Sequence, residues 1–230
     1  MALTTLAIDI GGTSLKMMAV DEQDQPLQER EKQPTPRPAT PQAILKTLED
    51  MFTRQPKFDR VSVGFPGVVK DGVVETAPNL DGEWASFDLA HAIQKKTSKP
   101  TKAANDADIQ GYGLIHGKGL EMVITLGTGL GSALFIDGKL VPNLELGHHP
   151  FKDNQTYEDY LGKRGVEKHG IEGWNHHLEE AVNLMRRIFN FDRLYVGGGN
   201  MHKVTCKFSK DVTISKNIAG LLGGIKLWEV

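Results

Sequence analysis

Short apolar runs separated by glycine turns open the chain. Residues 6–10 and 15–20 are mostly apolar, and Gly11-Gly12 stands between them, which predicts a strand, a tight turn and a second strand. Residues 27–32 fit a third, more polar strand at a sheet edge. The prolines between residues 34 and 41 predict an extended surface connection, because proline is excluded from helix interiors and central strands.

Helical spacing alternates with further strands along the rest of the chain. Residues 42–55 carry apolar side chains on one helical face, and Pro56 then ends the helix. Residues 61–69 form a strand pattern that Pro66-Gly67 interrupts. We expect four more helices, at residues 87–96, 106–115, 174–189 and 218–228, and further strands at residues 101–104, 121–126, 133–136 and 194–196. The apolar stripe of residues 174–189 suits core or a dimer surface better than a ligand site.

The strand, glycine turn, strand pattern returns in the second half of the chain. Residues 121–126 and 133–136 flank a glycine turn at residues 127–132, as the first two strands flank Gly11-Gly12. A repeat over so long an interval indicates two related lobes rather than a short-period array. We therefore predict an α/β protein with an N-terminal lobe of residues 1–104 and a C-terminal lobe of residues 105–230, whose closing helix, about residues 217–230, packs across the lobes.

Composition narrows the class of protein. The chain has 230 residues, 39% of them hydrophobic and 24% charged, with a formal net charge of -2, which describes an ordinary globular protein with no bias toward nucleic acid. We expect a cytoplasmic location, because the N-terminus lacks the features of a secretory signal and no apolar run is long enough to cross a bilayer. The single cysteine, Cys206, excludes an internal disulfide and a Cys-rich zinc cluster.

Two glycine loops are candidates for phosphate binding. In the segment from Asp9 to Lys16, glycines let the backbone approach a phosphate, and Thr13 adds a hydroxyl. The loop is no P-loop, and a following strand argues against a dinucleotide fingerprint. Alone, this loop would be better explained as a plain hairpin turn. A second loop at Gly127-Thr128-Gly129 makes phosphate binding the better interpretation, because two such loops could hold one phosphate chain.

Asn105-Asp106 lies where a predicted strand meets a predicted helix. The Asp106 carboxylate could accept a proton from a sugar hydroxyl as that oxygen attacks phosphorus. Either residue could instead only cap the helix, a common role for Asn and Asp. Both interpretations stay open on the sequence alone.

A second polar cluster surrounds Gly147. Glu145 and His148 lie on either side of this glycine and Glu158 follows, a set of side chains suited to binding vicinal hydroxyl groups of a sugar. A metal site built from His148, His149, Asp153 and Glu158 is the competing interpretation.

These motifs together resemble the ROK family of sugar kinases and repressors, and within it the polyphosphate glucokinases, over nearly the whole chain. The first glycine loop and the second each resemble a phosphate motif of the family. The matching sugar-side motifs are Val63-Gly64-Phe65-Pro66-Gly67, the Asn79-to-Trp84 segment, Asn105-Asp106 and Glu145-Leu146-Gly147-His148, and the nucleotide-side glycine segments are residues 197–199 and 217–224.

The resemblance implies an actin-like (ribonuclease H-like) fold and a hexose kinase that transfers phosphate from polyphosphate or ATP to the 6-hydroxyl of glucose. Asp106 would be the base, and Mg²⁺ would bind near Asp9 through water. The implied sugar ligands are Gly67, Asn79, Asn105, Asp106, Glu145, His148 and Glu158; the implied phosphate or nucleotide ligands are Asp9, Gly11, Gly12, Thr13, Lys16, Gly127, Thr128, Gly129, Gly198 and Gly199.

Further expectations concern partners and metals. The family resemblance implies a homodimer acting in carbohydrate metabolism. Residues 149–165 contain no Cys, so we expect no structural zinc, and eight residues before Asp9 leave no room for a repressor's helix-turn-helix. The basic residues Lys163, Arg164 and Lys168 are candidates for contacting polyphosphate. A sugar-binding regulator without phosphotransfer, or a kinase for mannose or an N-acetylhexosamine, remain the alternatives.

Overall fold

The computed structural model describes residues 3–23, 25–215 and 223–229. The chain divides into two compact units, which are Met1–Gly113 together with Ile218–Val230, and Leu114–Asn217. Each unit has its own sheet and its own core. Within the described residues, no helix is both long enough and apolar enough to cross a membrane.

The first unit is built on a five-stranded sheet in the order β3-β2-β1-β4-β8. The first three strands in this order, β3, β2 and β1, form an antiparallel meander. Strands β1, β4 and β8 run parallel to one another. The strand bounds are β1 Thr5–Ile10, β2 Ser14–Val20, β3 Glu31–Pro34, β4 Arg60–Phe65 and β8 Thr101–Asn105.

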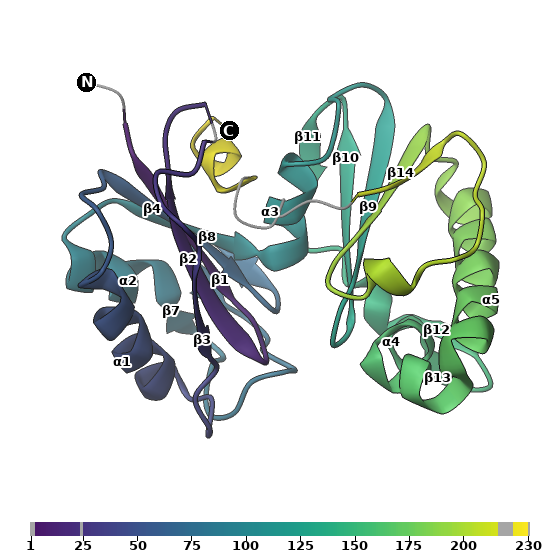
Figure 1. Ribbon diagram of the computed structural model, residues 1–230, viewed down its shortest axis with the longest axis horizontal. Helices are drawn as coiled ribbons and strands as arrows, with labels where there is room; N and C mark the ends of the chain where they lie inside the picture. Colours follow the sequence, from purple (N-terminus) through teal and green to yellow (C-terminus); the bar gives the residue numbers. More distant parts are fainter. Residues whose placement is uncertain (1–2, 24, 216–222, 230) are drawn as a thin grey trace. The chain divides into compact units, whose positions relative to one another are not determined.

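Successive side chains of a strand point to opposite faces of the sheet. Two α-helices of this unit pack against one of these faces. Leu6, Ile8 and Ile10 of β1 point into a core shared with α1 (Pro41–Phe52) and α2 (Leu89–Thr97). Ala7 points to the opposite face and packs with Ile225 of the 3₁₀ helix η3 (Gly223–Trp228). Figure 1 shows α1 and α2 on one side of the sheet and η3 on the other. A small three-stranded sheet adds β5 (Val69–Lys70), β6 (Val73–Val74) and β7 (Phe87–Asp88).

The second unit repeats this arrangement. Its five-stranded sheet has the order β11-β10-β9-β14-β15, again with an antiparallel meander followed by parallel strands. The strand bounds are β9 Leu120–Leu126, β10 Leu130–Ile136, β11 Lys139–Val141, β14 Arg193–Gly197 and β15 Val212–Ile214. The duplicated order is that of the actin-like fold, so the predicted fold class is confirmed.

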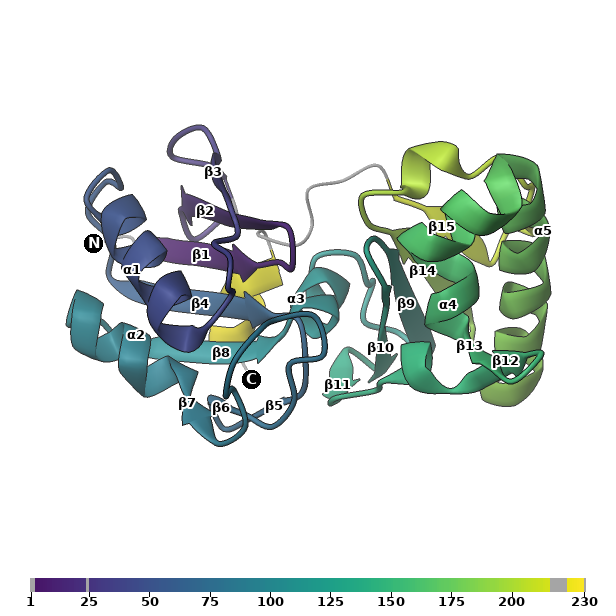
Figure 2. The same cartoon turned by 90° about the horizontal axis from the view of Figure 1, so that it is seen from below.

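Two helices pack on one face of the second sheet, α4 (Tyr157–Leu161) and α5 (Lys163–Phe189) (Figure 2). Trp174, Leu178 and Met185 of α5 are fully buried, so most of the predicted apolar stripe is core, whereas Ile188 is 56% exposed. The remaining short elements are β12 Pro150–Lys152, β13 Gln155–Thr156, and the 3₁₀ helices η1 Leu146–His148 and η2 Met201–Lys203.

α5 begins earlier than its periodicity predicts. The sequence indicated a start at Trp174, but the helix starts at Lys163 and is interrupted at Gly170, which has φ of 67°. This left-handed conformation is costly for most residues other than glycine. The break shifts the helical phase, which hides the first part of the helix from a periodicity argument.

The predicted lobe boundary after Ala104 differs from the boundary between the units. α3 (Asp106–Tyr112) belongs to the first unit, where a Cβ on Gly64 of β4 would lie 3.5 Å from the Cα of Asp106. η3 also packs on the first sheet, through a 2.6 Å hydrogen bond from Ser62 Oγ to the Gly224 carbonyl. Asp106 is therefore in the first unit, not in a C-terminal lobe. Residues 217–222 of the predicted closing helix lie outside the described residues.

A buried carboxylate fixes the segment that follows α3. Glu121 is fully buried and accepts hydrogen bonds from the N–H groups of His116, Gly117 and Lys118 and from the Tyr195 hydroxyl. Burial opposes the charge, but these hydrogen bonds hold the pKa of Glu121 below its ordinary value. The next two N–H groups donate to other carboxylates, Gly119 to Asp137 and Leu120 to Asp192.

Replacing Glu121→Gln should destabilise the protein by about 2–3 kcal/mol, because an amide NH₂ would face backbone donors that then lose their acceptor. Urea unfolding would measure the loss. The matched control is Glu49→Gln, since Glu49 is half-exposed and its ion pair with Lys96 is expected to contribute less than about 1 kcal/mol. Equal losses in the two variants would contradict the role of Glu121.

Candidate functional site

The candidate residues of the first unit lie at the carboxyl ends of its parallel strands. β1 leads into Gly11, β4 leads into Gly67, and β8 ends at Asn105. The register pairs Asp9 with Gly64 and Phe65 with Asn105, so these strand ends reach the same edge of the sheet. Ligands of open α/β sheets bind at this edge, because the loops that leave parallel strands gather there.

The first glycine loop needs its glycines for close approach. A Cβ on Gly11 would lie 2.8 Å from the Ser14 carbonyl oxygen, and a Cβ on Gly12 would lie 3.3 Å from the Asn79 carbonyl oxygen. Asn79, predicted as a sugar ligand, therefore lies against the loop that carries Thr13. The first unit thus brings a predicted phosphate loop and a predicted sugar-side segment into contact.

Lys16 forms an ion pair with Asp9. The two residues face each other across β1 and β2, and Lys16 Nζ lies 2.7 Å from Asp9 Oδ2. Asp9 is only 8% exposed, so the lysine compensates a largely buried charge. The predicted contact of Lys16 with a phosphoryl donor stays a prediction.

Asn105 is the residue that caps α3. Its Oδ1 accepts hydrogen bonds from the N–H groups of Ala107, at 2.8 Å, and Asp108, at 3.3 Å. Its Nδ2 donates to the Gly67 carbonyl at 3.1 Å, which ties the Pro66-Gly67 turn to the helix. Gly67 has no room for a side chain, since a Cβ would lie 2.0 Å from the Thr76 carbonyl oxygen. Asp106 is the half-buried first residue of the helix, so the capping role falls to its neighbour.

In the second unit, the second glycine loop lies beside the glycines that follow β14. β9 and β14 are parallel neighbours, and Gly198, at φ 95°, packs against the backbone of Leu126. Asn200 connects the two loops, because its Nδ2 donates to the Gly127 carbonyl at 2.7 Å. Gly127 and Gly199 face open space within the described structure, where a Cβ would have no neighbour within 4 Å. The two predicted phosphate segments are therefore adjacent.

Glu158 contacts this second glycine loop. Its Oε2 accepts a 3.2 Å hydrogen bond from the Leu130 N–H, and a Cβ on Gly129 would lie 1.9 Å from the same oxygen. Glu158 is held in place because α4 starts with a capping box between Thr156 and Asp159.

Glu145 and His148 lie near Glu158. His148 Nε2 is 3.5 Å from Glu145 Oε2. Burial raises the pKa of Glu145 above its ordinary value of 4.5, and the Glu158 charge adds to this, while His148 opposes it. Ser132 positions the segment by donating to the Leu144 carbonyl and accepting from the Leu146 N–H. The second unit therefore brings three of the predicted sugar ligands, Glu145, His148 and Glu158, close to the second predicted phosphate loop.

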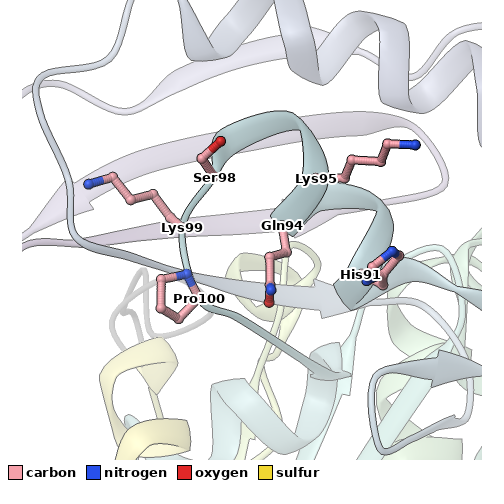
Figure 3. A pocket seen from close by; sticks show the side chains of 6 residues that line it. All are labelled: His91, Gln94, Lys95, Ser98, Lys99 and Pro100. Carbon is pink, nitrogen blue, oxygen red and sulfur yellow. The ribbon is translucent and has the colours of Figure 1, made fainter.

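Two other places in the fold are candidate binding sites: the alternative metal site around His148 and His149, and a cavity at the end of α2. Among residues 3–23, 25–215 and 223–229, no group of three or more His, Cys, Asp or Glu side chains could hold a metal ion, so the alternative metal site around His148 and His149 has no support. A cavity of about 460 Å³ lies at the end of α2, at the opposite end of β8 from Asn105. Figure 3 shows its Lys95 and Lys99 extending away from each other.

Comparison with known proteins identifies the family. Residues 5–165 match the model of the ROK family. The chain belongs to the ROK family. A solved structure, the inorganic polyphosphate/ATP-glucomannokinase of Arthrobacter sp. strain KM, superimposes with a TM-score of 0.89 at 31% identity, covering 98% of both chains.

Two curated relatives are similar over shorter stretches. The polyphosphate glucokinase of Mycobacterium leprae (strain TN) is 40% identical over 149 residues, which is 61% of this chain and 46% of that protein. The N-acetylmannosamine kinase of Citrobacter koseri (strain ATCC BAA-895 / CDC 4225-83 / SGSC4696) is 32% identical over 173 residues, covering 71% and 59%. The chain thus spans about half the length of these curated relatives.

Sequence reasoning missed several residues that contact the glycine loops. Thr35 and Arg37 donate hydrogen bonds to the first loop, and Asn200 donates to the second. The first two lie in the proline-rich segment that the sequence indicated only as a connection. No local pattern marks them, because their partners are backbone carbonyls more than 20 residues away.

The raised pKa of Glu145 predicts a gain in stability for Glu145→Gln at neutral pH. A raised pKa means that folding disfavours the charged carboxylate, so stability decreases as pH rises from about 4.5 through the raised value. The neutral amide removes this loss, and the melting temperature of the variant should exceed that of the wild type increasingly from pH 4.5 to pH 7.5.

The control for this pH series is Glu180→Gln. Hydrogen bonding from His177 lowers the pKa of Glu180, so its carboxylate stabilises the fold above its ordinary pKa. This variant should be less stable than the wild type throughout the series, and the difference should shrink only below about pH 4.5, where the Glu180 carboxylate of the wild type becomes protonated. The same sign in both variants would refute the assignment for Glu145.

Proposed function

We propose that this chain is a hexose kinase that transfers a phosphoryl group from polyphosphate or ATP to the 6-hydroxyl of glucose. The observation that carries the proposal is the contact of Glu158 with the second glycine loop, through Gly129 and the Leu130 N–H. Phosphoryl transfer to a sugar needs a phosphate cradle and hydroxyl-binding side chains within the same small volume. Membership of the ROK family and the names of the similar kinases support the same activity.

In this proposal the residues act mainly by positioning. Asn79, Asn105, Glu145, His148 and Glu158 hold the hexose hydroxyls. The 6-hydroxyl oxygen attacks the terminal phosphorus, its proton passes to the Asp106 carboxylate, and the bond from phosphorus to the bridging oxygen of the donor breaks. The loop N–H groups stabilise the charge that develops on the transferred phosphoryl oxygens.

Asp9 fits the place that the proposal gives to Mg²⁺. This ion usually binds one or two carboxylates together with substrate phosphates and water. Asp9 supplies one carboxylate at the start of the first glycine loop, and only its Oδ2 contacts Lys16. Bound there, Mg²⁺ would neutralise donor phosphate charge.

The identity of the hexose has one competing candidate. The N-acetylmannosamine kinase of Citrobacter koseri matches a larger share of this chain than the Mycobacterium leprae polyphosphate glucokinase does, 71% against 61%, although at lower identity. A coupled assay with glucose, mannose and N-acetylmannosamine, each with ATP and with polyphosphate, separates these substrates.

The expected homodimer and the expected cytoplasmic location also remain predictions. Light scattering would measure the oligomeric state, and cell fractionation would measure the location.

Asp106→Asn tests the general base. Because Asn105 caps α3, the variant should fold with a wild-type melting temperature. The amide still hydrogen-bonds a sugar but takes no proton, so kcat should fall by about 10²-fold or more while glucose affinity changes far less. Steady-state kinetics and calorimetric glucose titration measure both quantities. A folded variant that binds glucose and keeps kcat within about threefold of wild type would remove Asp106 from the mechanism.

The contribution of basic side chains to polyphosphate binding is tested by salt. Lys163, Arg164 and Lys168 are all exposed, so their attraction to a polyanion would be screened. Activity with polyphosphate should fall more steeply with ionic strength than activity with ATP. The triple replacement Lys163→Gln, Arg164→Gln and Lys168→Gln should bring the two slopes together. Equal slopes in the wild type would count against a dedicated polyphosphate contact.

A further inference from the structure

The carbonyl groups of the first glycine loop are all engaged from one side. Thr35 Oγ1 donates to the Gly11 carbonyl at 2.5 Å, and the Thr35 N–H donates to the Thr13 carbonyl at 3.1 Å. Arg37 donates from Nη2 to the Gly12 carbonyl at 2.7 Å. Three consecutive carbonyls of the loop therefore face the segment of residues 35–37.

This arrangement decides where the loop N–H groups point. In a planar trans peptide, the carbonyl of one residue and the N–H of the next point in opposite directions. With the Gly11 and Gly12 carbonyls held by Thr35 and Arg37, the N–H groups of Gly12 and Thr13 point away from them. Neither N–H donates to an acceptor in the described part of the chain. Two adjacent N–H groups on one side of a loop are suited to binding an anion.

Charge strengthens the effect of the Arg37 contact. A guanidinium that donates to a carbonyl forms a charge-assisted hydrogen bond, and it polarises the peptide so that the N–H on the other side becomes a stronger donor. It also keeps the negative end of the Gly12 peptide away from a bound phosphate. Thr35 is 7% exposed, so its two hydrogen bonds lie in a largely dry environment.

Arg37 also connects the loop to the sugar-side segment. Its Nη1 donates to Asp81 Oδ2 at 3.0 Å, and the same oxygen accepts from the Ala39 N–H. The hydrogen bond from Ala39 and the Arg37 charge hold the pKa of Asp81 below its ordinary value, so the pair stays ionised at neutral pH. One guanidinium thus bridges the glycine loop and the segment that begins at Asn79, two residues before Asp81.

We propose that Thr35 and Arg37 are positioning residues for the phosphoryl donor. They hold the peptides of the first glycine loop in the orientation that presents the Gly12 and Thr13 N–H groups to the donor phosphates. The inference rests on the proposed kinase function and adds to it two residues outside the glycine motif. Neither residue touches the donor; both act through the loop.

The test measures donor affinity and sugar affinity separately. Calorimetry with the non-hydrolysable ATP analogue AMPPNP, with inorganic tripolyphosphate and with glucose is run on the wild type, Thr35→Val and Arg37→Gln. Each variant frees a loop peptide to rotate, so donor binding should weaken by about threefold to tenfold. In Thr35→Val, which leaves the ion pair of Arg37 with Asp81 in place, glucose affinity should stay within about twofold, a separation that a general loss of fold would not produce. In Arg37→Gln, donor binding should weaken more than glucose binding.

Conservative and control variants isolate the hydrogen bonds. Thr35→Ser keeps the hydroxyl and should restore donor affinity. Thr47→Val and Arg54→Gln are the matched controls, because Thr47 donates within α1 and Arg54 pairs with Glu31, both away from the loop. Both controls should bind the donor as the wild type does. Arg37 is 58% exposed in its side chain, so Arg37→Gln supports the test even where Thr35→Val fails to fold.

The outcomes separate this inference from the proposed function. A wild type that binds a donor, together with folded Arg37→Gln and Thr35→Val variants that bind it equally well, would overturn the inference and leave the kinase proposal intact. Equal weakening of donor and glucose binding would also overturn it, because that result indicates a general structural defect. A wild type that binds neither donor would overturn the proposed function and the inference with it.

Discussion

Parallel strand pairing is the constraint on which the candidate site depends. In the first unit, β1, β4 and β8 end at one edge of the sheet, and in the second unit β9 and β14 do the same. Parallel strands must be joined by crossover connections, so the loops after their carboxyl ends gather at one edge. Asp9, Gly67 and Asn105 come from distant parts of the sequence, and this pairing is what makes them neighbours.

Close backbone approach is the second requirement, and it explains which glycines the site uses. Gly64 lets the first turn of α3 approach β4, and Gly129 leaves room for the Glu158 carboxylate. Gly198 combines a positive φ of 95° with contact against Leu126, so any side chain there would meet both strain and a collision. These glycines allow loops and carboxylates to lie within contact distance.

Two partly or fully buried carboxylates, Glu121 and Glu145, differ in whether the fold stabilises their charge. Glu121 is buried and fully hydrogen-bonded, so its charge stabilises the segment after α3. Glu145 is half-buried near Glu158, and burial raises its pKa, so folding disfavours its charge. A carboxylate kept under such a cost is typical of functional sites.

The sequence by itself predicted an α/β protein with a duplicated strand and glycine-turn pattern, and the resemblance of its motifs implied the family, the actin-like fold and the candidate site residues. These features are local, because they depend on apolar periodicity and on short motifs such as Gly11-Gly12 and Glu145-Leu146-Gly147-His148. Only the tertiary structure decided that Asn105 caps α3, that α3 and η3 belong to the first unit, and that Thr35 and Arg37 hold the first glycine loop. The cap formed by Asn105 is local, but sequence alone left open whether Asn105 or Asp106 would form it. The other facts depend on groups that meet across long sequence separations, and strand register and packing bring those groups together rather than any local pattern.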